Sequence, residues 1–218
     1  MLERRIFLEE LTEDYEELLL KYNAALKTLE TQIAILIQDY EFKNHYNPVE
    51  HVKSRIKSYD SIVNKLKSRD YDVTVENIEN HIHDVVGLRI VCSFLSDVYA
   101  IVKLLEDSDQ ITVHTKKDYI SNPKDSGYSS YHLLVYVPVY LIDGVEMVEA
   151  EIQIRTVAMD FWASLDHKIR YKFKGEIPNE IQENMYKCAL DINDLDQKMV
   201  DMNNQMRTII EDQEIIEI

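Results

Sequence analysis

The sequence predicts an α/β (α+β) fold, in which a mixed β-sheet of about five strands is flanked by helices and long helices lie at both ends of the chain. Four glycines and four prolines in 218 residues are too few turn-forming residues for a many-stranded barrel or sandwich. Apolar residues recur at helical spacing near both ends. Asp143-Gly144 separates two runs rich in β-forming residues, which is a strong hairpin signal.

The first half of the chain is interpreted as helical, with one buried strand. An apolar stripe at helical spacing predicts a helical segment over residues 1–42. Residues 48–69 are interpreted as a helix or helices. The run 85–94 is almost wholly apolar, which is typical of a buried strand. Residues 97–106 predict a short helix, for which Ser96 is a suitable N-cap.

The second half predicts most of the sheet. Residues 111–116 form a short strand, and the β-rich runs 131–140 and 145–154 are expected to pair antiparallel around the Asp-Gly turn. Pro138 cannot donate a backbone hydrogen bond, so it indicates an edge or a bulge at that point. Residues 156–170 return to a helical pattern.

The C-terminal end carries a heptad seam. Apolar residues alternate at spacings of four and three over four heptads, which predicts one long helix that begins just after Pro178. Four methionines in this seam favour an adaptable contact between subunits. We therefore expect a homo-oligomer built from a single domain over 1–218. The seam residues are Ile181, Met185, Cys188, Ile192, Leu195, Met199, Met202, Met206 and Ile209.

The charge is distributed unevenly along the chain, whose formal net charge is −16. The N-terminal helices (1–42) carry ten acids and four bases, and the C-terminal oligomerisation helix (176–218) carries eleven acids and three bases. The core between them (43–175) is nearly neutral, with nineteen acids and seventeen bases. Such an acidic chain disfavours DNA binding and docking on an anionic membrane. One segment of the core, 53–69, is nevertheless basic, with six bases and one acid.

The cysteines and the N-terminus predict a cytoplasmic protein. Cys92 and Cys188 are too few and too far apart for a disulfide framework. No apolar signal segment follows Met1, and no apolar run approaches the length of a membrane span.

Polar side chains gather on one face of the strand 145–154. Glu149, Glu151, Gln153 and Arg155 share that face by the two-residue period of a strand. The face either meets solvent or lines a polar cleft, and the helix that follows favours the cleft because its own polar residues form a stripe. These residues are Asp160, Ser164, His167 and Tyr171.

The basic segment is the candidate site for phosphate groups. If it is helical, Lys57, Ser61 and Lys65 repeat every four residues and can present two ammonium groups and a hydroxyl to a polyphosphate. The alternative is an ordinary solvated helix face. No glycine-rich P-loop or dinucleotide-binding motif is present. In a later loop, Gly127-Tyr128 with lysines nearby suits base stacking with phosphate contact.

Taken together, these segments resemble the small alarmone synthetases, the stand-alone (p)ppGpp synthetases (GTP pyrophosphokinases) of the RelA/SpoT superfamily. The resemblance covers roughly residues 45–175, and its motifs occur in the order found in the family. The matching stretches are Arg55-Ile56-Lys57 with Ser61 and Lys65, Asp84 to Arg89, Lys117-Asp118-Tyr119, Gly127 to His132, Glu151 to Thr156, and Met159 to His167.

The resemblance implies a nucleotidyltransferase-like synthetase core that transfers the pyrophosphate of ATP to the 3′-hydroxyl of GDP or GTP and releases AMP in the stringent response. It also implies Mg²⁺ as cofactor, a homotetramer, and no hydrolase activity, since the hydrolase domain of the long relatives has no counterpart. Asp84 and Glu151 would be catalytic and hold Mg²⁺. Arg55, Lys57, Ser61, Lys65 and Arg89 would bind ATP. Lys117, Lys124, Tyr128, His132, Gln153, Asp160 and His167 would bind GDP or GTP.

Two other functions stay open at this point. A related enzyme could pyrophosphorylate another acceptor such as the 3′ end of tRNA, although the acidic ends of the chain favour this less. The chain could instead be a non-catalytic nucleotide-sensing oligomer, for which two metal-binding carboxylates would be unnecessary. A regulatory nucleotide or RNA is a further partner that the sequence neither requires nor excludes.

Overall fold

A five-stranded sheet in the order β1-β2-β5-β4-β3 forms the centre of the molecule. The computed structural model describes residues 2–172 and 177–216, and among these the side chains of 2–13, 171–172, 207 and 210–216 are left out. Only β2 and β5 pair in parallel, and the other neighbouring strands are antiparallel, so the predicted mixed sheet is confirmed. The elements are α1 (Leu2–Asn44), β1 (Val49–Ile56), α2 (Tyr59–Lys67), α3 (Val75–His81), β2 (Val86–Cys92), α4 (Leu95–Glu106), β3 (Thr112–Asp118), β4 (Tyr131–Leu141), β5 (Gly144–Thr156), α5 (Val157–Lys172) and α6 (Asn179–Ile216).

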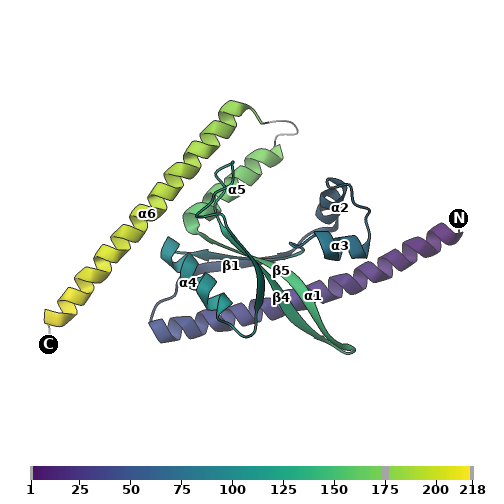
Figure 1. Ribbon diagram of the computed structural model, residues 1–218, viewed down its shortest axis with the longest axis horizontal. Helices are drawn as coiled ribbons and strands as arrows, with labels where there is room; N and C mark the ends of the chain where they lie inside the picture. The colour runs from purple at the N-terminus through teal and green to yellow at the C-terminus, as the bar shows by residue number, and fades with distance from the viewer. Residues whose placement is uncertain (1, 173–176, 217–218) are drawn as a thin grey trace.

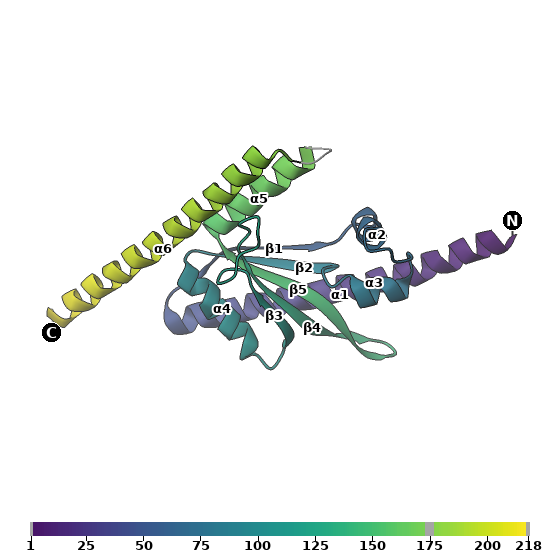
Figure 2. The same ribbon diagram turned by 45° about the horizontal axis from the view of Figure 1, so that its top comes forward.

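The helices lie around this sheet at different depths. Helix α1 runs along the sheet and extends beyond it at its N-terminal end, whereas α6 packs beside α5 and projects away from the sheet towards the C-terminus (Figures 1 and 2). The predicted apolar stripe of α1 is buried where it crosses the strands, and the apolar face of β5 is buried as well. The buried apolar residues on these two elements are Leu18, Tyr22, Ala25, Leu29, Ile33, Val148, Ala150, Ile152 and Ile154.

The interpretation of 48–69 as wholly helical is wrong. Val49–Ile56 form β1, an edge strand paired antiparallel with β2, and the helix α2 covers only Tyr59–Lys67. The polar and charged residues of β1 imitate a solvated helix face, because an edge strand exposes many of its side chains. The predicted helical spacing of Lys57, Ser61 and Lys65 therefore does not exist as such, because Lys57 lies in the connection before α2.

The predicted N-cap of α4 is also wrong by two residues. The helix begins at Leu95, and the carboxylate of Asp97 accepts a hydrogen bond from the backbone N–H of Phe94 (3.1 Å). Asp97 is buried and also accepts a bond from the hydroxyl of Tyr46 (2.7 Å). An acid in the first turn can satisfy the free N–H groups of a helix, so Ser96 is not needed for that purpose.

The hairpin around Asp143-Gly144 is confirmed. Strands β4 and β5 pair antiparallel from Tyr131 opposite Ile154 to Leu141 opposite Gly144. Pro138 lies on an inner strand, but β3 pairs with β4 only as far as Tyr136, so the outer side of β4 is open at the proline. The bulge occurs instead on β3, between Val113 and Thr115.

The start of each C-terminal helix is defined by a cap. The hydroxyl of Thr156 accepts a hydrogen bond from the backbone N–H of Met159 (3.1 Å) and caps the first turn of α5. The carbonyl of Pro178 accepts the first bonds of α6, as the sequence predicts. The Thr156 hydroxyl also donates to Asp196 of α6 (2.6 Å), which ties this helix to the end of β5.

Candidate active site

A row of five polar side chains crosses the whole sheet on one face. Lys53 lies opposite Arg89, Arg89 opposite Gln153, Gln153 opposite His132, and His132 opposite Lys117. Side chains of directly opposed residues stand on the same face. The register of the sheet therefore brings the basic strand β1, the buried strand β2 and the polar face of β5 together, although they are far apart in sequence. We call these five residues the cross-sheet row.

A cavity of about 220 Å³ lies over this face between β1, β2 and β5. Its wall includes both predicted metal-binding carboxylates, from Asp84 and Glu151, and both predicted adenine-binding residues, Arg55 and Arg89. The polar face of β5 thus lines a cleft. The remaining residues of the wall are Lys53, Ser54, Gly87, Leu88 and Gln153.

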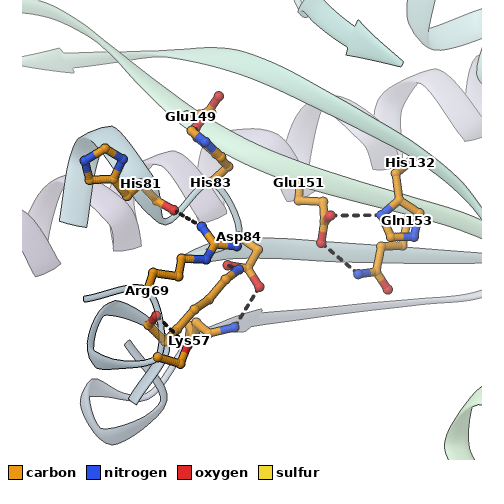
Figure 3. Close-up of polar contacts among 11 residues, drawn as sticks. Lys57, Arg69, His81, His83, Asp84, His132, Glu149, Glu151 and Gln153 are labelled. Atoms are coloured by element: carbon orange, nitrogen blue, oxygen red, sulfur yellow. Dashed lines mark hydrogen bonds and ion pairs between the residues drawn. The ribbon is translucent and has the colours of Figure 1, made fainter. Parts of the chain in front are cut away.

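Asp84 is held by two lysines at the entrance to β2 (Figure 3). Its Oδ2 accepts a hydrogen bond from Lys57 Nζ (2.7 Å), and its Oδ1 accepts one from Lys65 Nζ (2.8 Å). Burial by itself would raise the pKa of Asp84, but the two ammonium groups outweigh it and bring this pKa down to about 2. Asp84 is therefore an anion at neutral pH, and the two lysines that are predicted to bind phosphate converge on it.

Glu151 is held by a histidine and a glutamine side chain (Figure 3). Its Oε1 accepts a hydrogen bond from Nδ1 of the buried His132 (2.9 Å), and its Oε2 accepts one from the amide of Gln153 (2.7 Å). Burial and the charge of Asp84 raise the pKa of Glu151, whereas His132 and Gln153 lower it, and the net shift is downward. Glu151 is thus an ionised carboxylate within interacting distance of Asp84.

The predicted acceptor residues are connected around the buried Arg155. Tyr128 shares a hydrogen bond with His132 Nε2 (2.9 Å) and accepts one from Arg155 NH2 (2.9 Å). The same NH2 group donates to Gln153 Oε1 (2.6 Å). We call the closed circuit of Glu151, His132, Tyr128, Arg155 and Gln153 the Glu151 ring.

Asp160 connects the Glu151 ring to the wall of the cavity. It lies in the first turn of α5, and its Oδ1 accepts hydrogen bonds from Arg89 NH1 (3.0 Å) and Arg155 NH1 (3.4 Å). One carboxylate oxygen therefore serves two guanidinium groups, one on the cavity wall and one in the Glu151 ring.

Lys124 lies above the aromatic residues of the loop between β3 and β4. Its Nζ is 4.6 Å from the ring centre of Tyr119 and 5.0 Å from that of Tyr128. This loop has its tight turn at Gly127, whose φ is +86°, and Tyr128 follows directly. The basic side chain and the predicted stacking residue are thus neighbours.

Three predicted residues lie further out. Ser61 is exposed on α2 and shares a hydrogen bond with Ser58 (2.8 Å). Lys117 is exposed at the β3 end of the cross-sheet row. His167 is exposed on α5, seven residues beyond Asp160. Tyr171, the last member of the predicted stripe, has its side chain outside the described part of the chain.

Sequence reasoning assigned no role to two residues of this site. Lys53 was recognised only as part of the basic segment, because the register of β1 was unknown. Arg155 was placed on the polar face of β5, but its complete burial was not foreseen. The sequence does carry a signal for Arg155. It is a charged residue two positions after Gln153, on the same face of the strand, and the helix that follows presents the acidic Asp160.

Comparison with known proteins identifies the family. Residues 54–176 match the description "Region found in RelA / SpoT proteins". The chain belongs to the RelA/SpoT family. The matched RelA/SpoT region contains every predicted site residue, from Arg55 to His167.

Within the RelA/SpoT family, the similarity extends to relatives of similar length. The chain is 44% identical over 91% of its length to GTP pyrophosphokinase YwaC of Bacillus subtilis, of which it covers 95%. The crystal structure of small alarmone synthetase 1 from B. subtilis bound to its product pppGpp matches with a TM-score of 0.80 and 33% identity, covering 88% of this chain and 97% of that one. The structure of the same synthetase bound to AMPCPP matches with a TM-score of 0.76 and 30% identity, over 90% and 99%. No helix in the described part of the chain is both long and apolar enough to cross a membrane.

Proposed function

We propose that this RelA/SpoT protein is a (p)ppGpp synthetase, which transfers the pyrophosphate group of ATP to the 3′-hydroxyl of GDP or GTP and releases AMP in stringent-response signalling. One observation carries the proposal: a cavity holds two ionised carboxylates, with two lysines and an arginine pair on one side and the Glu151 ring on the other. The 44% identical relative is named a GTP pyrophosphokinase, and the 33% identical structure contains pppGpp, which supports this assignment.

On the donor side, Arg55 and Arg89 hold the adenine between them, and Lys57, Ser61 and Lys65 bind the phosphates. The two lysines already meet at Asp84, so they are positioned to exchange its carboxylate for phosphate oxygens when ATP enters. That exchange frees Asp84 to bind a metal ion. The lysines would stabilise the transition state by neutralising the charge of the ATP phosphates, as phosphoryl-type transfers require.

Asp84 and Glu151 fit Mg²⁺. Both are anionic carboxylates on one cavity wall, and Mg²⁺ is commonly held by one or two carboxylates together with substrate phosphates. The described residues contain no group of three or more His, Cys, Asp or Glu that could hold a metal ion, so the remaining ligands come from ATP and water. When bound, Mg²⁺ neutralises charge on the transferred pyrophosphoryl group.

On the acceptor side, Tyr128 stacks on the guanine, and Lys117 and Lys124 bind the 5′-phosphates. His132, Gln153, Asp160 and His167 surround the nucleotide. Glu151 takes the proton of the 3′-hydroxyl of the guanine nucleotide, and the oxygen of this hydroxyl attacks the β-phosphorus of ATP. The bond from that phosphorus to the oxygen bridging the α-phosphate breaks, and AMP leaves with the electron pair.

We further propose that the protein is a cytoplasmic homotetramer assembled through α6. Five residues of the seam are 41–55% exposed in the single chain, although they are large and apolar. An apolar stripe of this length on one helix indicates a contact with another subunit. These residues are Leu195, Met199, Met202, Met206 and Ile209.

The deciding experiment incubates the protein with Mg²⁺, ATP and one labelled acceptor at a time, namely GDP, GTP or tRNA, and resolves the products by chromatography. We expect AMP in equal amounts with the 3′-pyrophosphorylated guanine nucleotide. Omission of Mg²⁺ should abolish both products. Label transfer to tRNA alone, or absence of AMP with both guanine nucleotides, refutes the proposal.

A further inference from the structure

Arg155 is the largest fully buried side chain of the described residues, with 2% of its surface exposed. A buried guanidinium is costly unless its charge and its donors are matched. Its carboxylate contact is long, because Asp160 Oδ1 lies 3.4 Å from NH1 and is shared with Arg89. Its Nε is buried and has no hydrogen-bond partner among the described residues. The site therefore retains Arg155 at an energetic cost, although an apolar residue would fill the same space.

The two hydrogen bonds from Arg155 NH2 reach both branches of the Glu151 ring. Arginine can only donate, so the Tyr128 oxygen accepts from NH2, and the same hydroxyl shares a hydrogen bond with Nε2 of His132. Burial raises the pKa of Tyr128 in spite of the nearby Arg155, so the phenol keeps its proton at neutral pH. The other ring nitrogen of His132, Nδ1, lies 2.9 Å from Oε1 of the Glu151 carboxylate, so Arg155 is linked to Glu151 through Tyr128 and His132.

The second branch of the ring works in the same way. Arg155 NH2 occupies Gln153 Oε1, which leaves the amide nitrogen of Gln153 to donate to Glu151 Oε2. A free glutamine amide could present either end to the carboxylate, and one of these ends would repel it. Both oxygens of Glu151 thus receive hydrogen bonds from groups whose orientation is set by one buried cation.

We propose that Arg155 is a positioning residue, which orients Tyr128, Gln153 and His132 for the acceptor nucleotide and, through them, directs the Glu151 carboxylate at the 3′-hydroxyl. This inference rests on the synthetase function proposed above. Arg155 touches no reacting atom. Its effect reaches the acceptor half of the site through the Tyr128 hydroxyl and the Gln153 amide.

The first test is a double-mutant cycle of Arg155→Lys and Tyr128→Phe, with the KM for the guanine nucleotide and the KM for ATP measured in each variant. Lysine keeps the charge but cannot bridge Tyr128 and Gln153 as the planar fork does. We expect each single variant to raise the guanine-nucleotide KM with little change in the ATP KM. The double variant should be no worse than the more damaged single one, because both remove the same link. Fully additive effects would overturn the proposal.

The second test compares kcat and the two KM values in Arg155→Met with those in Arg155→Lys. Methionine removes both hydrogen bonds of NH2, so kcat should fall about 10²-fold by lost alignment and the guanine-nucleotide KM should rise, with the ATP KM little changed. Lysine can keep one of the two bonds, so Arg155→Lys should lose less kcat than Arg155→Met.

Two controls separate the possible outcomes. Arg170→Met removes an exposed arginine of α5 and should leave all kinetic constants unchanged. If Arg155→Met loses melting temperature and kcat and raises both KM values equally, Arg155 is structural and the proposal is wrong. If Arg155→Met does not fold, the cycle with the conservative variants still decides. Failure of the wild-type protein to form a pyrophosphorylated guanine nucleotide would refute the proposed function itself, which is a separate result from additivity in the cycle.

Discussion

At the scale of single residues, the two carboxylates of the site are kept ionised by different means. Asp84 is neutralised by two ammonium groups, whereas the direct partners of Glu151 are an imidazole and an amide. The two ammonium groups at Asp84 can move to phosphate oxygens, and a metal ion would then replace their positive charge at the carboxylate. Hydrogen bonds from an imidazole and an amide orient a carboxylate and leave lone pairs on its oxygens with which it can accept a proton. The surroundings of Asp84 thus suit a metal ligand, and those of Glu151 suit a base.

We expect Glu151→Gln to lower kcat by about 10²–10⁴-fold, the usual contribution of a general base. The amide is isosteric and can still accept from Gln153 or His132, so the fold and ATP binding should persist. The measurement is kcat by AMP release, together with ATP affinity by calorimetry.

The matched control is Glu149→Gln, on the same face of β5 and two residues away. Glu149 shares a hydrogen bond with Nδ1 of His83 (2.6 Å) and lies 2.9 Å from Nε2 of His114, both outside the Glu151 ring, so this variant should retain its turnover. Equal losses in both variants would remove the special role of Glu151.

The alternation of side chains along β5 predicted which residues share the polar face, but it did not predict how the lysines and Arg155 are positioned. The two-residue period correctly placed Glu151, Gln153 and Arg155 on one face. The convergence of Lys57 and Lys65 was anticipated from a helical spacing that does not exist, since Lys57 precedes α2. The role of Arg155 depends on its burial and on the position of Tyr128, and both are set by a loop that the sequence pattern does not orient.

At the scale of elements, helix α6 is packed against the loop that carries Tyr128. A Cβ on Gly127 would lie 2.5 Å from the Cβ of Ala189, so backbone and helix meet there without space between them. The indole N–H of Trp162 in α5 donates a hydrogen bond to the backbone carbonyl of Met185 in α6 (3.0 Å). The predicted stacking residue is therefore positioned by an element outside the sheet.

We expect Gly127→Ala to raise the KM for the guanine nucleotide with little effect on the KM for ATP. The substitution adds a methyl group where Ala189 leaves no room and places alanine at φ +86°, which costs about 1–2 kcal/mol. The loop must therefore shift, and Tyr128 shifts with it.

Gly144→Ala is the control for backbone strain. Gly144 also has a positive φ (+144°), but a Cβ there would meet nothing within 4 Å. It should cost stability, measured by thermal unfolding, without changing either KM. A change of the ATP KM in Gly127→Ala equal to that of the acceptor KM would contradict the local role of this contact.

Sequence patterns predicted the elements well where one face is buried and poorly where neither is. The stripe of α1, the apolar run of β2 and the hairpin of β4 and β5 each bury a continuous apolar face, and each was recognised. Strand β1 was missed because an edge strand has charged side chains and only a partly buried face. Its register against β2, which completes the cross-sheet row, is set by long-range pairing alone.

At the scale of the whole molecule, the two halves of α6 differ. The first half packs beside α5 and the Tyr128 loop, whereas the second half projects from the body of the protein and exposes its seam (Figure 1). The oligomer that we propose would cover this second half. One helix would then contact both another subunit and the loop that carries Tyr128.

We expect Met202→Glu to reduce the molar mass measured by light scattering, because a charge buried in a subunit contact without a partner costs about 3–5 kcal/mol. Asn204→Glu adds the same charge at an exposed position two residues away, off the seam, and should leave the mass unchanged. A wild-type protein that scatters as a monomer would refute assembly through α6.

The sheet is open at both edges, which are β1 and β3. An edge with unpaired backbone groups can add a strand from another chain and so start aggregation, and charged side chains along the edge oppose this. On β1 this protection comes in part from Lys53 and Arg55, which also form part of the cavity wall. The same residues thus serve solubility as well as nucleotide binding. Apolar substitutions at both positions would expose a strand able to pair with its neighbours, so inactivity of such a variant should be interpreted only after its colloidal state has been checked.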